Sequence, residues 1–342
     1  MKYIKRLPDP EVIKNEYPLD EKYSKLRAEI LQDLQNILNG KSEKKLIIVG
    51  PCSADREDAV LDYVTRLSKL QAEVKNTFLL VPRVYTSKPR TNGLGYKGLL
   101  HRPYAASESD DIASGIIAMR KLHRRIICDT EMFPADEMLY PQIYQYVSDL
   151  LVYMAVGARS VEDQEHRLIA SGVGIPIGMK NPTGGNISVM LNAISAAQAA
   201  QRIIFGDWEA ETEGNPYAHA ILRGYTDSTG TTISNYYYEN LMRLHDQYYK
   251  SNLNNPAVIV DCNHANSGKR YQEQPRIAEN VLDSCKRNAG LNRFVKGLMI
   301  ESYLEDGSQM IGEGIYGKSI TDPCLGWEKT QLLIQRLADN IE

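Results

Sequence analysis

The stretch Ala257-Val-Ile-Val-Asp-Cys-Asn-His-Ala-Asn-Ser-Gly-Lys-Arg270 joins an apolar strand to a run of polar residues. Residues 258–260 are apolar at every position, which is typical of a parallel strand covered on both faces. The chain then turns polar within a few residues and includes His264. Because α/β folds build their sites at the carboxyl ends of parallel strands, this run predicts a functional rim. The alternative is a structural histidine that caps the strand by bonding a neighbouring loop.

Seven further apolar segments alternate with helical patterns along the chain of 342 residues. With 258–260, the predicted strands are 46–49, 78–81, 126–128, 154–158, 176–180, 202–205 and 298–300. The predicted helices are 19–39, 57–70, 109–122, 140–151, 162–170, 187–200, 236–250 and 327–341. Eight strand–helix units predict a (β/α)8 TIM barrel of the α/β class, and a doubly wound sheet is the alternative.

The chain outside the barrel pattern suggests two additions. Residues 1–40 are expected to form an N-terminal extension, in which 1–18 have little structure of their own and a helix follows. Residues 41–342 would then form the barrel domain. The segment 206–224 has no helical pattern and predicts a β-hairpin insertion after strand six.

Composition excludes several classes of function. The formal net charge of -3 provides no general attraction to nucleic acid or to an anionic membrane. Five cysteines without a CxxC pair argue against a disulfide framework and for a reducing compartment. The N-terminus has no apolar signal region, and no apolar run approaches the roughly 20 residues needed to span a bilayer. We therefore expect a soluble, cytoplasmic protein.

Four residues that follow predicted strands are of metal-ligand type: Cys52, His264, Glu301 and Asp322. A thiol, an imidazole and two carboxylates suit one divalent transition metal ion, Mn, Fe, Co or Zn, better than Mg or Ca. Each residue also has a structural alternative. Cys52 could be a packed small residue after a Gly-Pro turn, Glu301 a partner of Lys318, and Asp322 a helix cap before a proline.

A second set of strand-end residues is cationic. It consists of Arg83, Lys88, Arg90, Arg159, Lys180, Arg223 and Lys269. Cations gathered at one rim repel one another unless anionic ligands join them, and arginine forks match phosphate and carboxylate oxygens. From the residues alone, we interpret the chain as a metal-assisted enzyme that acts on small phosphorylated substrates.

Six short motifs occur in order along the chain. They are Gly50-Pro51-Cys52-Ser53, Lys88-Pro89-Arg90-Thr91, Gly157-Ala158-Arg159, Ile221-Leu222-Arg223-Gly224, His264-Ala265-Asn266-Ser267 and Gly317-Lys318-Ser319-Ile320-Thr321-Asp322. Together they resemble the class I 3-deoxy-D-arabino-heptulosonate 7-phosphate (DAHP) synthase family, of the enterobacterial and yeast subtype. The resemblance spans roughly residues 40–340 and implies a metal-dependent condensation of phosphoenolpyruvate with D-erythrose 4-phosphate, the first step of the shikimate pathway.

The resemblance also implies a role for each matching residue. It makes Cys52, His264, Glu301 and Asp322 the metal ligands, with Cys52 and His264 also counted as catalytic. The substrate-binding residues that it implies are Arg83, Lys88, Arg90, Thr91, Glu131, Ala158, Arg159, Lys180 and Arg223. Of these, Arg90 and Thr91 resemble contacts to the phosphate of erythrose 4-phosphate. We expect Lys88 to be the catalytic acid, with a pKa lowered by Arg83 and Arg90.

The sequence departs from the family in the segment 131–156, which is longer, in the hairpin region, which is shorter, and in its arm, which starts later. Feedback by an aromatic amino acid is an expectation from regulated relatives, and Gly174 favours tyrosine. The arm and first helix are expected to mediate a homodimer or homotetramer. Alternative functions are a related synthase that uses another aldose phosphate, such as arabinose 5-phosphate, and a non-catalytic protein that binds phosphorylated metabolites.

Overall fold

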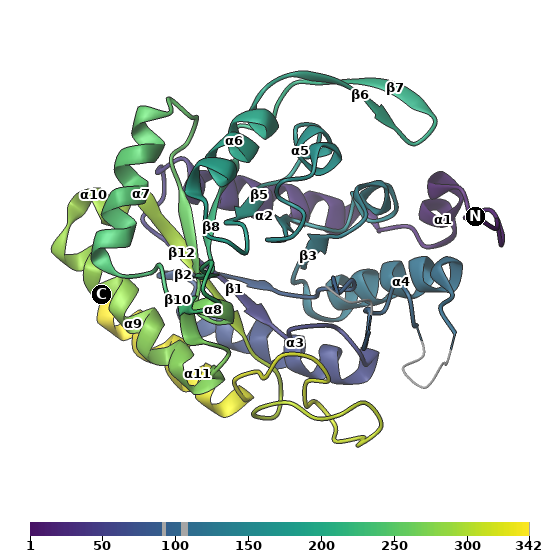
Figure 1. The fold of residues 1–342 in the computed structure, drawn as a ribbon. Helices are drawn as coiled ribbons and strands as arrows, with labels where there is room; N and C mark the ends of the chain where they lie inside the picture. Colours follow the sequence, from purple (N-terminus) through teal and green to yellow (C-terminus); the bar gives the residue numbers. More distant parts are fainter. Residues whose placement is uncertain (91–93, 104–108, 342) are drawn as a thin grey trace.

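The computed structural model describes residues 1–90, 94–103 and 109–341. Its centre is a parallel sheet of eight strands in the order β2-β1-β12-β11-β8-β5-β4-β3, surrounded by helices (Figure 1). The strands are β1 (Lys45–Gly50), β2 (Phe78–Pro82), β3 (Ala135–Met138), β4 (Tyr153–Val156), β5 (Ile177–Lys180), β8 (Ala218–Leu222), β11 (Val258–Asp261) and β12 (Val295–Glu301). All eight strands are described, and in them only Glu137 is not buried.

The sheet closes on itself between β2 and β3. A parallel bridge pairs Arg83 with Ala135, and the Val84 N–H donates to the Ala135 carbonyl at 2.9 Å. At the start of β2, where β3 does not pair with it, the side chain of Gln71 satisfies the free backbone groups. It donates to the Phe78 carbonyl and accepts from the Leu80 N–H. The prediction of a (β/α)8 barrel is confirmed, and the doubly wound alternative is wrong.

The helices of the barrel lie outside the sheet (Figure 1). They are α3 (Glu57–Val74), α4 (Ile112–Thr130), η1 (Pro141–Tyr146), α5 (Gln164–Ala170), α6 (Ile187–Gln198), α7 (Tyr238–Lys250), α8 (His264–Ser267), η2 (Tyr271–Glu273), α9 (Gln274–Arg287), α10 (Ala289–Phe294) and α11 (Trp327–Ile341). Each long helix buries one apolar stripe against the strands, which places a single hydrophobic core between the two layers. In the described part of the chain, none of the helices has the length and apolar character needed to cross a membrane.

The prediction of a third strand at 126–128 is wrong. These residues belong to α4, whose buried residues Ile116, Met119, Ile126 and Ile127 continue one helical stripe. The third strand is β3, and the predicted helix at 140–151 is only the short 3-10 turn η1. A run of three apolar residues fits a buried strand and a buried helix face equally well, so its periodicity could not decide between them.

The hairpin exists, but it precedes the sixth barrel strand. The segment 202–205, which was predicted as that strand, lies in β6 (Gln201–Phe205), which pairs antiparallel with β7 (Trp208–Thr212) away from the barrel (Figure 1). Burial alternates along β6, and Ile204 is 79% exposed. The sixth barrel strand is β8. A second hairpin follows it, formed by two strands of two residues each, β9 (Tyr225–Thr226) and β10 (Thr232–Ile233).

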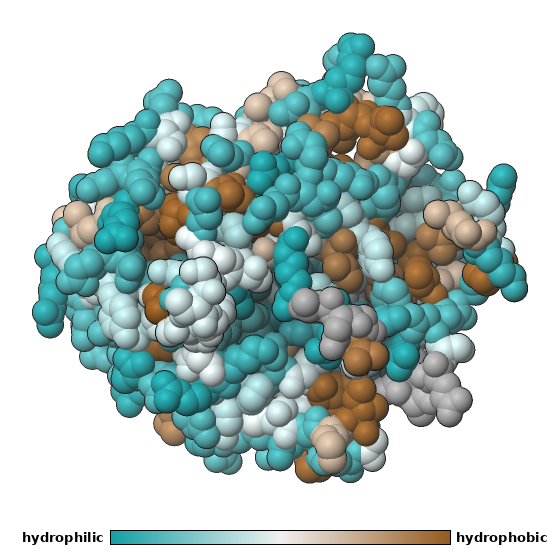
Figure 2. Space-filling model, in the orientation of Figure 1, coloured by the Kyte–Doolittle hydropathy of each residue, from teal (hydrophilic) through white to brown (hydrophobic). Residues whose placement is uncertain are grey.

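The N-terminal extension is more ordered than predicted. It contains α1 (Pro10–Glu16) as well as α2 (Glu21–Leu38), and the Asp9 carboxylate caps α1 by accepting from the N–H groups of Glu11 and Val12. Ile13 and Leu34 are buried with the barrel core. Exposed hydrophobic residues remain on the arm and on the hairpin β6–β7, where Figure 2 shows a brown patch over the upper part of the molecule.

Candidate active site

A cavity opens at the carboxyl ends of the barrel strands. It is lined by Arg83, Lys88, Pro89, Glu137, Ala158, Arg159, Lys180, Arg223, His264, Lys269 and Asp322. Six of these eleven residues are lysine or arginine, and they follow four different barrel strands as well as α8. Strand ends far apart in the sequence therefore supply one strongly cationic site, as the fold requires. Six of the seven predicted strand-end cations line this one cavity, Arg90 being the exception, and their roles in ligand binding stay predictions.

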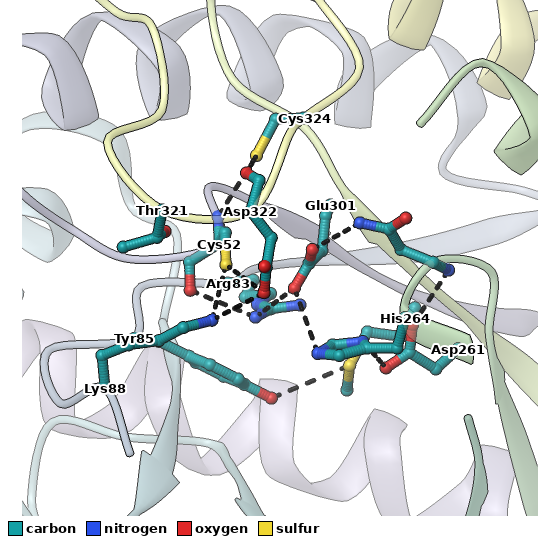
Figure 3. A network of polar contacts seen from close by, with 12 residues as sticks. Cys52, Arg83, Tyr85, Lys88, Asp261, His264, Glu301, Thr321, Asp322 and Cys324 are labelled. Atoms are coloured by element: carbon teal, nitrogen blue, oxygen red, sulfur yellow. Dashed lines mark hydrogen bonds and ion pairs between the residues drawn. The ribbon is translucent and has the colours of Figure 1, made fainter. Parts of the chain in front are cut away.

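Three of the four predicted metal ligands lie together. Ligand atoms of Cys52, Glu301 and Asp322 are all within 4.8 Å of one another (Figure 3). Cys52 follows β1, Glu301 ends β12, and Asp322 lies in the loop before α11. Burial raises the pKa of the Cys52 thiol to about 11, so the thiolate form requires added positive charge. A divalent cation supplies such charge, and this donor set fits one.

His264 borders this cluster. Its Nε2 atom lies 3.6 Å from Glu301 Oε1, and its Nδ1 atom lies 2.8 Å from Asp261 Oδ2 (Figure 3). A carboxylate behind an imidazole fixes the ring orientation and directs the other nitrogen toward a metal. The backbone of His264 has a φ of 48°, a left-handed conformation that costs free energy and that is concentrated at functional sites.

Arg83 is the most deeply buried cation of the cavity. It is 1% exposed, and its Nη2 atom lies 2.8 Å from Glu301 Oε1. Its guanidinium carbon lies 4.0 Å from the centre of the Tyr85 ring. Within the described residues, Nε and Nη1 of Arg83 have no hydrogen-bond partner. Buried donors without acceptors are costly, so these two atoms favour an anionic ligand.

Lys180 and Arg223 extend the cationic wall. Burial lowers the pKa of both groups, and the charge of Arg159 lowers that of Arg223 further. Lys180 Nζ lies 3.7 Å from Asp261 Oδ2 and 5.5 Å from the centre of the Tyr85 ring. The cationic forms are therefore only partly compensated by the protein, and phosphate or carboxylate oxygens would complete the compensation.

Lys88 links the cationic wall to the ligand cluster. Its ammonium lies 2.7 Å from Cys52 Sγ and 3.1 Å from Asp322 Oδ2 (Figure 3). The predicted lowering of its pKa is wrong. Burial alone would lower the pKa, but the charges of Cys52, Asp322 and Glu301 outweigh burial and raise it. The predicted neighbour Arg90 donates from Nε to the Tyr96 carbonyl at 2.8 Å.

Comparison with known proteins agrees with this geometry. The sequence model of the DAHP synthetase I family matches residues 17–335. The chain belongs to the DAHP synthetase I family. The Tyr-sensitive phospho-2-dehydro-3-deoxyheptonate aldolase of Escherichia coli K12 is 35% identical, over 98% of this chain and 93% of that protein. The Phe-sensitive protein of the same strain is 36% identical, over 100% and 96%.

A solved structure extends the comparison to the fold. Phospho-2-dehydro-3-deoxyheptonate aldolase from Francisella tularensis SCHU S4 superimposes with a TM-score of 0.91 at 30% identity, covering 99% of this chain and 98% of that chain. DAHP synthetase I proteins are metal-dependent, and this member gathers Cys52, Glu301 and Asp322 as a possible metal site. The resemblance seen in the six motifs is thus confirmed over nearly the whole chain.

The prediction of Glu131 as a substrate-binding residue is wrong. Glu131 ends α4 with a φ of 58° and lines a separate cavity with Ile30, Phe78 and Met132, near the amino ends of the strands. The glutamate that lines the active-site cavity is Glu137 of β3. The error follows from the misplaced third strand, because β3, which contains Glu137, begins nine residues after the predicted strand.

Other predicted and unpredicted residues complete the site. Ala158 lines the cavity as predicted, whereas Thr91 lies outside the described residues. The role of Arg90 at an aldose phosphate stays a prediction. Sequence reasoning missed Tyr85 and Asp261, which touch the site cations and His264. Asp261 was detectable from the sequence, because it is the only charged residue of the otherwise apolar strand β11.

Proposed function

We propose that this chain is a DAHP synthase, which condenses phosphoenolpyruvate with D-erythrose 4-phosphate to give DAHP and phosphate. The observation that carries the proposal is the juxtaposition of a six-cation cavity with the Cys52–Glu301–Asp322 cluster. The curated relatives bear the name of this activity, phospho-2-dehydro-3-deoxyheptonate aldolase. We assign the activity to residues 41–342 and treat 1–40 as an extension.

Phosphoenolpyruvate carries a phosphate and a carboxylate, which together need several cations. We assign Arg83, Arg159, Lys180 and Arg223 to these two groups, with Ala158 beside them. The assignment is supported by the unpartnered nitrogens of Arg83 and by the burial that lowers the pKa values of Lys180 and Arg223. Arg90 and Thr91 are assigned to the phosphate of erythrose 4-phosphate.

Cys52, His264, Glu301 and Asp322 would hold one divalent ion, Mn, Fe, Co or Zn. Such an ion, when bound, supplies a Lewis acid for the aldehyde carbonyl of erythrose 4-phosphate. The carbon–carbon bond then forms between C3 of phosphoenolpyruvate and the aldehyde carbon. The carbonyl oxygen becomes an alkoxide and takes a proton from the Lys88 ammonium. In the metal-free protein its neighbours raise the pKa of Lys88, so this residue is charged before the metal ion and the substrates bind.

Water adds at C2 of the former phosphoenolpyruvate, and the resulting intermediate expels phosphate by breaking the C2–O bond. Glu137 is the carboxylate in the cavity that can take the proton of this water. Gly157 leaves room for it, because a Cβ there would lie 2.7 Å from Glu137 Oε1. The hydroxyl proton of the intermediate leaves with the phosphate, which balances the step.

The relatives also bear on how the protein is regulated and assembled. Relatives named Tyr-, Phe- and Trp-sensitive have similar identities to this chain, from 33% to 36%. We propose feedback by an aromatic amino acid, with tyrosine favoured because residue 174 is the small residue glycine. We also propose a homodimer or homotetramer that covers the exposed hydrophobic residues of the arm and hairpin, among them Ile4 and Ile204.

The test is an assay of phosphate release from phosphoenolpyruvate with Mn²⁺ and a panel of aldose phosphates, repeated with tyrosine, phenylalanine and tryptophan. We expect turnover with erythrose 4-phosphate. Turnover with arabinose 5-phosphate alone would favour the related synthase. Absence of turnover with every aldehyde would favour a binding protein and would contradict the proposal.

A further inference from the structure

Asn263 connects the parts of the ligand cluster. It is fully buried, at 0% exposed, in the turn between β11 and α8. Its Nδ2 atom donates to Glu301 Oε2 at 2.5 Å and to the Pro323 carbonyl at 3.4 Å. The side-chain amide of Asn263 therefore contacts Glu301, one proposed metal ligand, and Pro323, the residue that directly follows Asp322, a second proposed ligand.

The remaining polar atoms of Asn263 tie it to the third part of the site. Its backbone N–H donates to Asp261 Oδ1 at 3.0 Å, and the other oxygen of Asp261 lies 2.8 Å from His264 Nδ1. Its Oδ1 atom accepts from the Ser267 hydroxyl at 2.7 Å. The amide cannot turn over without losing this bond and placing its oxygen against the Glu301 carboxylate, so its orientation is determined.

The two oxygens of Glu301 consequently have different surroundings. Oε2 is held by the Asn263 amide, whereas Oε1 faces Arg83 Nη2 at 2.8 Å and His264 Nε2 at 3.6 Å. We propose that Asn263 is a positioning residue that holds Glu301 for ligation through Oε1 and couples that oxygen to His264 through Asp261. The inference rests on the proposed function, which takes Glu301 and His264 as ligands.

The test measures metal binding rather than turnover. Removal of an outer contact to a metal ligand typically lowers metal affinity about 10–100-fold. We expect that loss for Mn²⁺ in Asn263→Ala by titration calorimetry, and a shift of the visible bands of bound Co²⁺ while the sulfur-to-cobalt band of Cys52 persists. Ser267→Ala frees the amide without removing it, so its loss of affinity should be smaller. His264→Ala serves as the reference for removal of a ligand.

A matched control separates positioning from general loss of stability. Asn215 is also buried, and its amide donates to the Val173 and Ile175 carbonyls at 2.9 Å, outside the active-site cavity. Asn215→Ala should lower thermal stability and leave the dissociation constant for Mn²⁺ unchanged.

The outcomes distinguish a failure of the metal assignment from a failure of the positioning role of Asn263. If the unsubstituted protein binds no Mn²⁺, the metal assignment of the proposed function fails. If that protein binds Mn²⁺ and both Asn263→Ala and Ser267→Ala bind it with the same affinity and the same Co²⁺ spectrum, the positioning role is overturned.

Discussion

Lys88 illustrates how a contact partner reverses an expectation at the scale of one residue. In the sequence it stands near Arg83 and Arg90, which suggests a lowered pKa. In the structure its ammonium faces the thiol of Cys52 and the carboxylate of Asp322, so the pKa is raised. A charged lysine between the ligand cluster and the cationic wall is placed to donate a proton to an oxygen formed there.

Lys88→Met should therefore lower kcat by about 10²–10⁴, the usual contribution of a general acid, and leave phosphoenolpyruvate binding largely intact. Binding is read from the rise in melting temperature on adding phosphoenolpyruvate. Lys97→Met is the control, because Lys97 belongs to the same loop but pairs with Asp110. Turnover close to that of the unsubstituted chain would remove Lys88 from the mechanism.

Sequence reasoning at this scale succeeded where a residue's type and its place after a strand were both informative. Cys52, Glu301 and Asp322 were expected together and lie together. Glu131 and Glu137 are the same residue type six positions apart, so only the course of the backbone could tell which one faces the cavity. Residue type alone carries no information about direction.

At the scale of elements, the loop after β5 depends on one glycine. Gly185 has a φ of 80°, and a Cβ there would lie 2.3 Å from the ring of Tyr225 at the start of β9. Gly184 precedes it without a positive φ, and no described atom lies within 4 Å of a Cβ built there. These neighbours form a matched pair of substitution sites just beyond Lys180.

Gly185→Ala should destabilise the protein by about 1–2 kcal/mol through its left-handed backbone, with the clash adding to that cost. Because the loop follows Lys180, the KM for phosphoenolpyruvate should also rise. Gly184→Ala should change stability by less than about 0.5 kcal/mol. Chemical denaturation and steady-state kinetics measure both effects, and equal behaviour of the two variants would show that the loop tolerates a side chain at either position.

Element prediction failed where a short apolar run was considered without its neighbours. The apolar run 126–128 is the last turn of the buried stripe of α4, and 202–205 is half of an exposed hairpin. The sixth strand, β8, lies within the segment 206–224 that was predicted as a hairpin, and it contains His219. Its imidazole is buried because Tyr153 on β4 provides a partner at 2.8 Å.

At the scale of the whole molecule, the cationic cavity couples ligand binding to stability. Burial and the charge of Arg159 both oppose the charged form of Arg223, and the carboxylate of Asp261 offsets them only in part, so the free protein contains incompletely compensated positive charge. Arg223→Met should keep or raise the melting temperature without ligand and lose most of the increase caused by phosphoenolpyruvate. A ligand at about 100 times its Kd contributes roughly 2.7 kcal/mol.

Scanning calorimetry with and without phosphoenolpyruvate measures this coupling. Arg243→Met, at an exposed position of α7, is the control and should retain the full increase. A full ligand-induced increase in Arg223→Met would place the ligand elsewhere.

The barrel interior sets an acid limit to stability. Burial lowers the pKa of His219 to about 4 from 6.5, although its bond to the Tyr217 carbonyl opposes this. Above pH 6.5 the imidazole is neutral in both the folded and the unfolded states. As the pH falls from 6.5 to 4, only the unfolded state gains the proton, so stability should drop by about 3 kcal/mol from this group.

Unfolding free energies of His219→Gln across this range should show a weaker pH dependence, because the glutamine cannot take up a proton. The same substitution at His245, which is only half-buried on α7, is the control. If the free energy of unfolding of His219→Gln depends on pH as strongly as that of the unsubstituted protein, groups other than His219 cause the loss of stability below pH 6.5.

The sequence by itself determined the class of the fold and the chemistry of its rim. Repeated fully apolar strands with helices between them require both faces of a parallel sheet to be covered, and polar residues after those strands must meet at one end. Tertiary structure decided which of two glutamates enters the cavity, whether the pKa of Lys88 is raised or lowered, and which segment forms the sixth strand. These depend on contacts between residues far apart in the chain, such as Lys88 with Asp322 and Tyr153 with His219, whose distances local pattern does not contain.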